Sequence, residues 1–115
     1  ETLEAALVNL VKNALAAMPN GGQLMVRTRV ARAGVALDMI DTGCGMDEKT
    51  LFRMFEAFYS TKSNGTGLGL PTARKIIGGH GAMIDVQSAP GLGTKFTIEF
   101  PTPARLGDAG TTGAE

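Results

Sequence analysis

The sequence predicts an α+β fold, in which about three helices cover one face of a mostly antiparallel sheet as a two-layer sandwich. Three observations predict it. Segments with helical periodicity and segments with strand alternation follow in the order helix, two strands, helix, loop, helix, two strands. A short turn joins the strands of each pair, as in an antiparallel hairpin. A parallel sheet requires a crossover, usually a helix, between successive strands, and this alternation of single strands with helices is missing.

The first half of the chain is expected to form one helix and one hairpin. The helix covers residues 2–18, with Thr2 as its N-cap, and stops at "PNGG". "QLMVRTRV" (23–30) alternates apolar residues with arginines, which is typical of a half-buried strand. The turn "ARAG" leads into "VALDMID" (35–41), so the two strands form a hairpin.

The second half is expected to form two helices and a second hairpin. After the loop "DTGCGM", residues 47–58 form a short helix with Asp47 as its N-cap. Residues 59–70 are mostly small and polar and form a loop. Pro71 opens the helix "PTARKIIGGHG", because the first turn of a helix tolerates proline. "AMIDVQS" and "GTKFTIEF" then pair around "APGLG".

The length of 115 residues fits one compact domain, which we place at residues 1–102. Its N-terminal edge is expected to be truncated, because the helical pattern begins at the second residue. Residues 103–115 are rich in Gly, Pro, Thr and Ala and lack apolar periodicity. They are therefore expected to form a disordered tail or linker.

The composition argues against several classes of function. Basic and acidic residues number 11 each, so no electrostatic attraction to nucleic acid or to a membrane surface is expected. No apolar run approaches the roughly 18 residues that span a bilayer, and no signal-peptide pattern opens the chain. The single cysteine, Cys44, excludes an intrachain disulfide. We expect a soluble cytoplasmic module with no nucleic-acid partner and no direct membrane contact.

Two asparagines in the first helix are candidate metal ligands. Asn9 and Asn13 are spaced i, i+4 and share one face of the helix. A neutral oxygen ligand suits a Mg²⁺ ion that also keeps water and phosphate oxygens. Two solvated amides on an exposed face are the alternative, because this face is expected to point away from the apolar stripe, which consists of Leu3, Leu7, Leu10, Ala14 and Met18.

The loop after the second strand, "DTGCGM", is a candidate site for a flat ring. Asp41 places a carboxylate at the strand end, where it can accept hydrogen bonds from an amine. Gly43 and Gly45 would let a ring approach the backbone closely. A routine strand-end turn explains the same residues equally well.

Two later segments are candidates for contact with phosphate. In "FEAFYSTK", Phe55 and Phe58 are expected to pack, while Ser60, Thr61 and Lys62 supply two hydroxyls and one ammonium. Lys62 is either a solvated charge or a partner for a terminal phosphate. The glycines of "GTGLGL" (65–70) expose backbone N–H groups, and the helix that follows directs its positive end toward them.

These pieces occur in one order, and together they resemble the GHKL superfamily of ATP-binding domains, in particular the catalytic domain of bacterial sensor histidine kinases. "NLVKNA" is similar to that family's asparagine box, "DTGCGM" to its first glycine box, "FEAFYSTK" to its phenylalanine box and "GTGLGL" to its second glycine box. "GLGTKFTIEFP" is similar to its closing hairpin. The resemblance covers roughly residues 3–101 and implies a Bergerat-type sandwich that binds ATP and Mg²⁺.

The resemblance also implies roles for residues. Asn13 would ligate Mg²⁺, and Asn9 would support the metal or the phosphates. Asp41 would accept from the adenine amine, with Thr94 sharing a bridging water. The resemblance further implies that residues 59–66 form a lid and that Lys62, like Asn9, has a catalytic role. It implies contacts with the nucleotide by the amides of Gly67, Leu68 and Gly69, which surround the phosphates, and by Gly43, Gly45, Ser60, Thr61 and Thr66.

Three functions fit this resemblance: a kinase that phosphorylates a histidine on a separate helical domain, a hydrolase similar to gyrase or mismatch-repair MutL modules, and a non-catalytic nucleotide-binding module. Hydrolytic relatives carry a glutamate four residues before the metal asparagine, as a general base. Asn9 stands there, and an amide cannot accept a proton near neutral pH. The kinase is therefore favoured. Its implied partners are the phosphoacceptor helical domain of the parent protein and a downstream response regulator receiver domain.

Two single residues require interpretation. His80 is the only histidine, at the corner between the third helix and the strand after it. We expect it to form a hydrogen bond with structural or capping function rather than to accept phosphate, so that the chain alone does not autophosphorylate. Cys44 is expected to pack in the interior or to face the nucleotide.

Overall fold

The computed structural model of the chain describes residues 2–32, 34–56 and 69–101. Its elements follow the predicted order, and the predicted α+β class is confirmed. Predictions for the loop at 59–68 and the tail at 103–115 lie outside the described residues. The elements are α1 (Leu3–Ala16), β1 (Leu24–Ala31), β2 (Gly34–Asp41), α2 (Glu48–Arg53), α3 (Gly69–Gly79), β3 (Met83–Ser88) and β4 (Thr94–Pro101).

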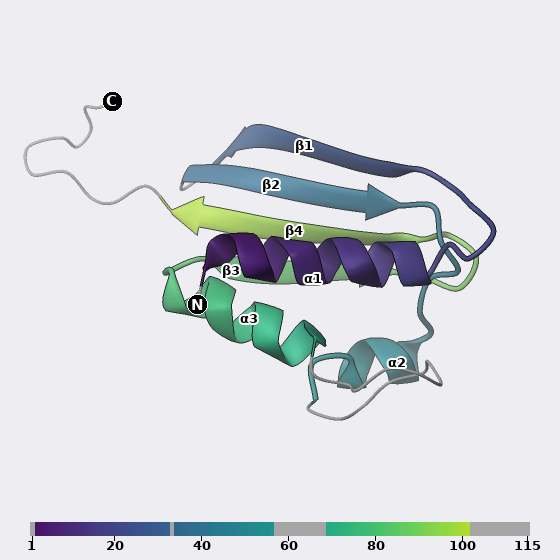
Figure 1. Ribbon diagram of the computed structural model, residues 1–115. Coiled ribbons are helices and arrows are strands. Elements are labelled where there is room, and N and C mark those ends of the chain that lie inside the picture. Colours follow the sequence, from purple (N-terminus) through teal and green to yellow (C-terminus); the bar gives the residue numbers. More distant parts are fainter. Residues whose placement is uncertain (1, 33, 57–68, 102–115) are drawn as a thin grey trace, which may run out of the picture.

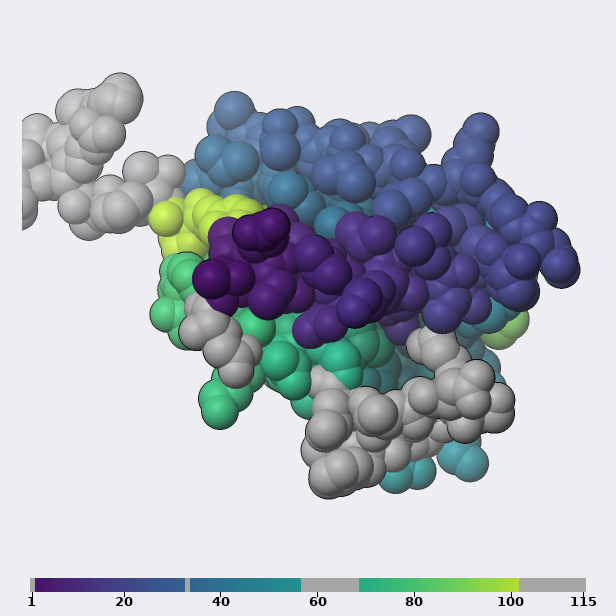
Figure 2. Space-filling view, in the orientation of Figure 1, coloured from purple at the N-terminus to yellow at the C-terminus, as the bar shows by residue number. Residues whose placement is uncertain are grey.

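The four strands form one sheet in the order β1-β2-β4-β3, and every neighbouring pair is antiparallel. The second hairpin therefore joins the first through β4, which pairs with β2 along its whole length. Helices α1 and α3 lie side by side against one face of this sheet (Figure 1). On that side of the molecule α1 is exposed to solvent between the first hairpin and α3 (Figure 2).

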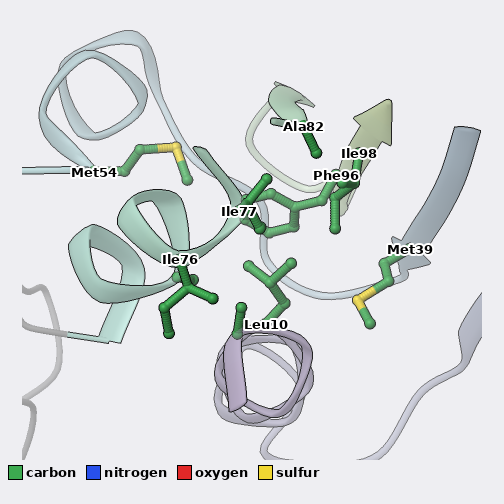
Figure 3. Close-up of a cluster of buried hydrophobic side chains, with 10 residues drawn as sticks. Leu10, Met39, Met54, Ile76, Ile77, Ala82, Phe96 and Ile98 are labelled. Atoms are coloured by element: carbon green, nitrogen blue, oxygen red, sulfur yellow. The ribbon is translucent and has the colours of Figure 1, made fainter. Parts of the chain in front are cut away.

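The hydrophobic core lies between the two helices and the sheet. Alternation along the strands directs every second side chain toward the helices. Leu10 of α1 points toward Ile77 of α3 and Phe96 of β4 (Figure 3), and all three are at most 2% exposed. The other members of this buried cluster are Ala6, Met39, Met54, Ala73, Ile76, Ala82 and Ile98.

Several helix boundaries differ from the prediction: α1 ends at Ala16 instead of 18 and α3 ends at Gly79 instead of 81, and two further differences have a clear physical reason. Helix α2 ends at Arg53 instead of 58, because the N–H of Glu56 donates to the carbonyl of Arg53 at 2.8 Å in a tighter turn. Helix α3 already includes Gly69, two residues before Pro71, since the first turn has no intrahelical use for the missing N–H of proline. The predicted N-caps, Thr2 and Asp47, are confirmed by their bonds to Ala5 and Thr50. Among the described residues, no helix has the length and apolar character needed to cross a bilayer.

The sheet face away from the helices carries a buried carboxylate. Asp38 is 0% exposed, and its Oδ2 accepts from Nε of Arg27 and Nε of Arg29, both at 2.9 Å. Its Oδ1 accepts from the Thr97 hydroxyl at 2.8 Å. The hydrogen bond from Arg29, together with those from Arg27 and Thr97, holds the pKa of Asp38 far below its usual range. The cluster ties β1, β2 and β4 together.

We expect Asp38→Asn to lower the free energy of unfolding by about 2 kcal/mol at pH 7, since hydrogen bonds to a charged group are lost while both arginines stay accessible to water. Because the folded pKa is depressed, the contribution of Asp38 is complete above about pH 4, the usual value for aspartate. It is lost as the pH falls below that value. Urea unfolding between pH 7 and pH 3 measures this.

The wild type should lose stability more steeply below pH 4 than Asp38→Asn. Part of the slope remains in the variant, because the pKa of Asp47 is also lowered by its hydrogen bonds to Thr50. Equal slopes in the two proteins would show that Asp38 does not stabilise the fold through its charge.

Candidate functional site

Asp41 is the centre of the candidate site. It is the last residue of β2, on the helix-facing side of the sheet, and it is 3% exposed. Its Oδ1 accepts from the N–H of Gly43 at 2.8 Å and from the N–H of Thr94 at 3.2 Å. Within the described part of the chain, Oδ2 receives no hydrogen bond. A buried carboxylate oxygen without a donor is costly in a folded protein, so this atom fits a site for a ligand donor.

Thr94 and Ser88 lie beside Asp41 on the two next strands. Thr94 opens β4 and pairs directly with Asp41, and Ser88 closes β3 and pairs directly with Thr94. The Ser88 Oγ lies 2.9 Å from the Thr94 Oγ1. The sequence prediction included Thr94 but missed Ser88. The available signal was that Ser88 takes the place of an apolar residue in the alternation of Ile84 and Val86.

The loop 42–46 is held against two neighbouring segments. The N–H of Cys44 donates to the carbonyl of Ala17 at 3.1 Å, and the Cys44 carbonyl accepts from Gly91 at 2.7 Å. A Cβ on Gly43 would lie 2.7 Å from the Cβ of Ala17. Gly45 has a φ of 74°, and its Cβ would overlap the carbonyl of Ala89. The protein itself therefore requires both glycines, whether or not a ring approaches them.

Asn9 and Asn13 are both partly buried, which departs from the expectation of a face well away from the apolar stripe. At about 100° per residue they lie roughly 100° and 60° around α1 from the buried Leu10. Each is therefore at the flank of the buried stripe. Asn13 is one helical turn before Ala17, so the asparagine row leads toward the loop that follows Asp41.

The predicted phosphate-binding residues fall mostly outside the described residues. These are Ser60, Thr61, Lys62, Thr66, Gly67 and Leu68, together with the expected lid at 59–66. Gly69 is described: it is the exposed first residue of α3. The N-terminal end of α3 is directed toward the same side of the molecule as the end of β2 and the C-terminal end of α1 (Figure 1).

The residues present fit a metal that arrives with a nucleotide. In the described part of the chain, no group of three or more His, Cys, Asp and Glu side chains could hold a metal ion. Mg²⁺ in nucleotide sites needs only one or two protein oxygens, because phosphates and water supply the rest. The amide oxygens of Asn9 and Asn13 are of that kind.

The structure also bears on two expectations about single residues, His80 and Cys44. Nδ1 of His80 lies 2.8 Å from the carbonyl of Ile76, in the last turn of α3, which confirms the expected capping contact. Cys44 is exposed, so the expectation that it packs in the interior is wrong. The backbone N–H and carbonyl of Cys44 form the hydrogen bonds that hold the loop.

Phe55 packs against the core as expected, and the guanidinium carbon of Arg74 in α3 lies 5.0 Å from the centre of its ring.

Comparison with known proteins gives relatives for most of the chain. Residues 1–104 match the family described as histidine kinase-, DNA gyrase B- and HSP90-like ATPase. Sporulation kinase E of Bacillus subtilis (strain 168) is 42% identical over 100 residues, which are 86% of this chain and 14% of that protein. The chain thus spans only a small part of this relative.

Solved structures agree with this match. The mycobacterial sensor histidine kinase MprB has a TM-score of 0.74 and 29% identity, over 84% of this chain and 68% of that one. Full-length ShkA, solved in complex with AMPPNP, has a TM-score of 0.71 and 28% identity, over 84% of this chain and 20% of that one. The chain belongs to the family of histidine kinase-, DNA gyrase B- and HSP90-like ATPases.

Proposed function

We propose that this chain is the ATP-binding catalytic domain of a sensor histidine kinase, working in the cytoplasm. It would pass the γ-phosphoryl group of ATP to a histidine on a separate helical domain of the parent protein. The observation that carries the proposal is the buried carboxylate of Asp41, whose Oδ2 has no donor among the described residues. The exocyclic amine of adenine is a donor of the required kind. The structure of the similar kinase ShkA with AMPPNP supports the same ligand class.

The base would then lie at the edge formed by β2 and β4, and the phosphates would extend toward α1 and the start of α3. We assign Asn13 to the metal and Asn9 to the metal or the phosphates, because both residues are partly buried, lie on one helix face and carry an amide oxygen. Bound Mg²⁺ would neutralise charge on the phosphate oxygens. The amides of Gly67, Leu68 and Gly69, the side chains of Ser60, Thr61 and Thr66, and the ammonium of Lys62 are assigned to the phosphates on the resemblance.

Transfer requires little chemistry from the domain itself. An imidazole nitrogen of the acceptor histidine forms a bond to the γ-phosphorus, and the bond from that phosphorus to the β–γ bridging oxygen breaks, so that ADP leaves. The domain contributes position and charge neutralisation. Hydrolysis is disfavoured, because Asn9 cannot act as a general base. A response regulator receiver domain is the proposed next acceptor.

A phosphotransfer assay tests the proposal. The chain is incubated with Mg²⁺ and ATP labelled at the γ-phosphate, with and without the helical domain of the parent protein as a separate polypeptide. We expect acid-labile label on the helical domain only. Label on this chain alone, abolished by His80→Gln, would assign His80 as an acceptor and contradict the proposal. Free phosphate as the main product would indicate a hydrolase.

The metal assignment makes a separate prediction. Asn13→Ala should weaken ATP binding by about tenfold in the presence of Mg²⁺, through the loss of one ligand, and should make binding much less sensitive to Mg²⁺. Calorimetric titration with and without Mg²⁺ measures both effects. Asn20→Ala, at an exposed position after α1, is the matched control. If Asn13→Ala binds ATP with wild-type affinity and the same dependence on Mg²⁺, the metal assignment is wrong.

A further inference from the structure

Ser88 connects three parts of the candidate site through one hydroxyl. The N–H of Met46, in the loop after β2, donates to its Oγ at 2.8 Å. The carbonyl of Gly93, in the turn before β4, lies 2.9 Å from the same oxygen, and so does the Thr94 hydroxyl. The hydroxyl thus has three partners within hydrogen-bond distance.

The chemistry of these partners determines the position of the protons. Ser88 has one hydroxyl proton, and the Gly93 carbonyl can only accept, so that proton goes to Gly93. The Met46 N–H can only donate. For the contact between Ser88 and Thr94 to be a hydrogen bond as well, the Thr94 hydroxyl must donate to Ser88. This is the only arrangement that satisfies all three contacts, and it leaves the Thr94 oxygen with lone pairs only.

We propose that Ser88 is a positioning residue for recognition of the base, which fixes the Thr94 hydroxyl as an acceptor. The inference rests on the proposed function. Asp41 and Thr94 pair across β2 and β4 on the helix-facing side, so the site presents two acceptors, Oδ2 and Oγ1, and no side-chain donor from these two residues. A purine with an amino group at position 6 matches this pattern. In a purine with a carbonyl group at position 6, the carbonyl oxygen is itself an acceptor and would face acceptors only.

Removal of the Ser88 hydroxyl releases the proton of Thr94. The Thr94 hydroxyl can then rotate and donate to a carbonyl oxygen on the base. Ser88→Ala should therefore change which base is preferred, in addition to any loss of overall affinity. A purely structural role would weaken the binding of both kinds of purine to the same degree.

The test is calorimetric titration of the chain with ATP and with inosine triphosphate, which carries a carbonyl oxygen in place of the amine. We expect the wild type to prefer ATP. In Ser88→Ala the ratio of the two dissociation constants should fall by about fivefold, the factor that corresponds to one neutral hydrogen bond. Ser88→Thr keeps the hydroxyl and should therefore keep the wild-type ratio of the two dissociation constants. Should Ser88→Ala not fold, Ser88→Cys, with a much weaker donor and acceptor, carries the same prediction.

The control is Thr97→Val, which removes a hydroxyl from the same strand as Thr94 but on the opposite sheet face, where it contacts Asp38. It should lower stability and leave the ratio unchanged. If the wild type prefers ATP and Ser88→Ala or Ser88→Cys keeps the full preference, the role of Ser88 is refuted while the proposed function stands. If the wild type binds no ATP, both are refuted.

Discussion

Asp41→Asn will weaken the binding of ATP by about 100-fold, the loss expected when a hydrogen bond to a buried charged acceptor is replaced by a contact between two donors. The amide keeps the shape of the carboxylate, and its oxygen can still accept from Gly43 and Thr94. Its NH₂ group then takes the place of Oδ2 and faces the amine of adenine, so two donors oppose each other. Calorimetric titration with ATP measures the change.

The same substitution should improve the relative binding of inosine triphosphate, because the new NH₂ group can donate to the carbonyl oxygen of that base. Asp85→Asn is the matched control: Asp85 is an exposed aspartate of β3 that pairs with Thr97, on the sheet face away from the helices. It should bind both nucleotides as the wild type does. If Asp41→Asn folds and binds ATP with unchanged affinity, the base does not lie at Asp41.

Gly45→Ala will lower the free energy of unfolding by about 3 kcal/mol, through a strained backbone and a steric overlap together. Gly45 has a φ of 74°, and a Cβ there would overlap the carbonyl of Ala89, which belongs to the turn between β3 and β4. The loop after Asp41 would have to move away from that turn. Urea unfolding measures the loss, and ATP binding should weaken as well, because the loop carries Gly43 and Met46.

Gly91→Ala separates the two causes. Gly91 has a similar φ of 78°, but a Cβ there would meet nothing within 4 Å. It should therefore show only the backbone cost, about 1–2 kcal/mol. The difference between the two variants measures the steric overlap at Gly45. Equal losses would mean that the loop accommodates a side chain at position 45 without cost beyond backbone strain.

The fold could be predicted from the sequence because each element has its own local signal. Alternation in "QLMVRTRV" and the turn "ARAG" predict the first hairpin, and Thr2 and Asp47 mark two helix starts by their capping chemistry. Boundaries were less accurate. The end of α2 at Arg53 depends on a local turn to Glu56 and on the burial of Met54 in the core, and no periodicity in the sequence reports either one.

The candidate site could be predicted only where residue type alone suggests chemistry. Asp41 at a strand end is visible in the sequence, and the resemblance added Thr94. The contact between them joins residues 53 positions apart and depends on the register of β2 against β4. Ser88 was missed for the same reason, because its importance comes from three partners on other segments. Likewise, the exposure of Cys44 follows from the path of the loop backbone.

The most direct test of the central claim, that ATP binds at the edge formed by β2, β4 and the end of α1, is a ¹H–¹⁵N NMR titration of the chain with Mg²⁺ and ATP. We predict saturable shifts of the amide resonances of Gly43, Met46 and Thr94, whose N–H groups bond to Asp41 or Ser88. The amides of His80 and Met83, at the opposite end of α3 and β3, should not shift. Saturable shifts confined to that opposite end, or none at all, would contradict the account.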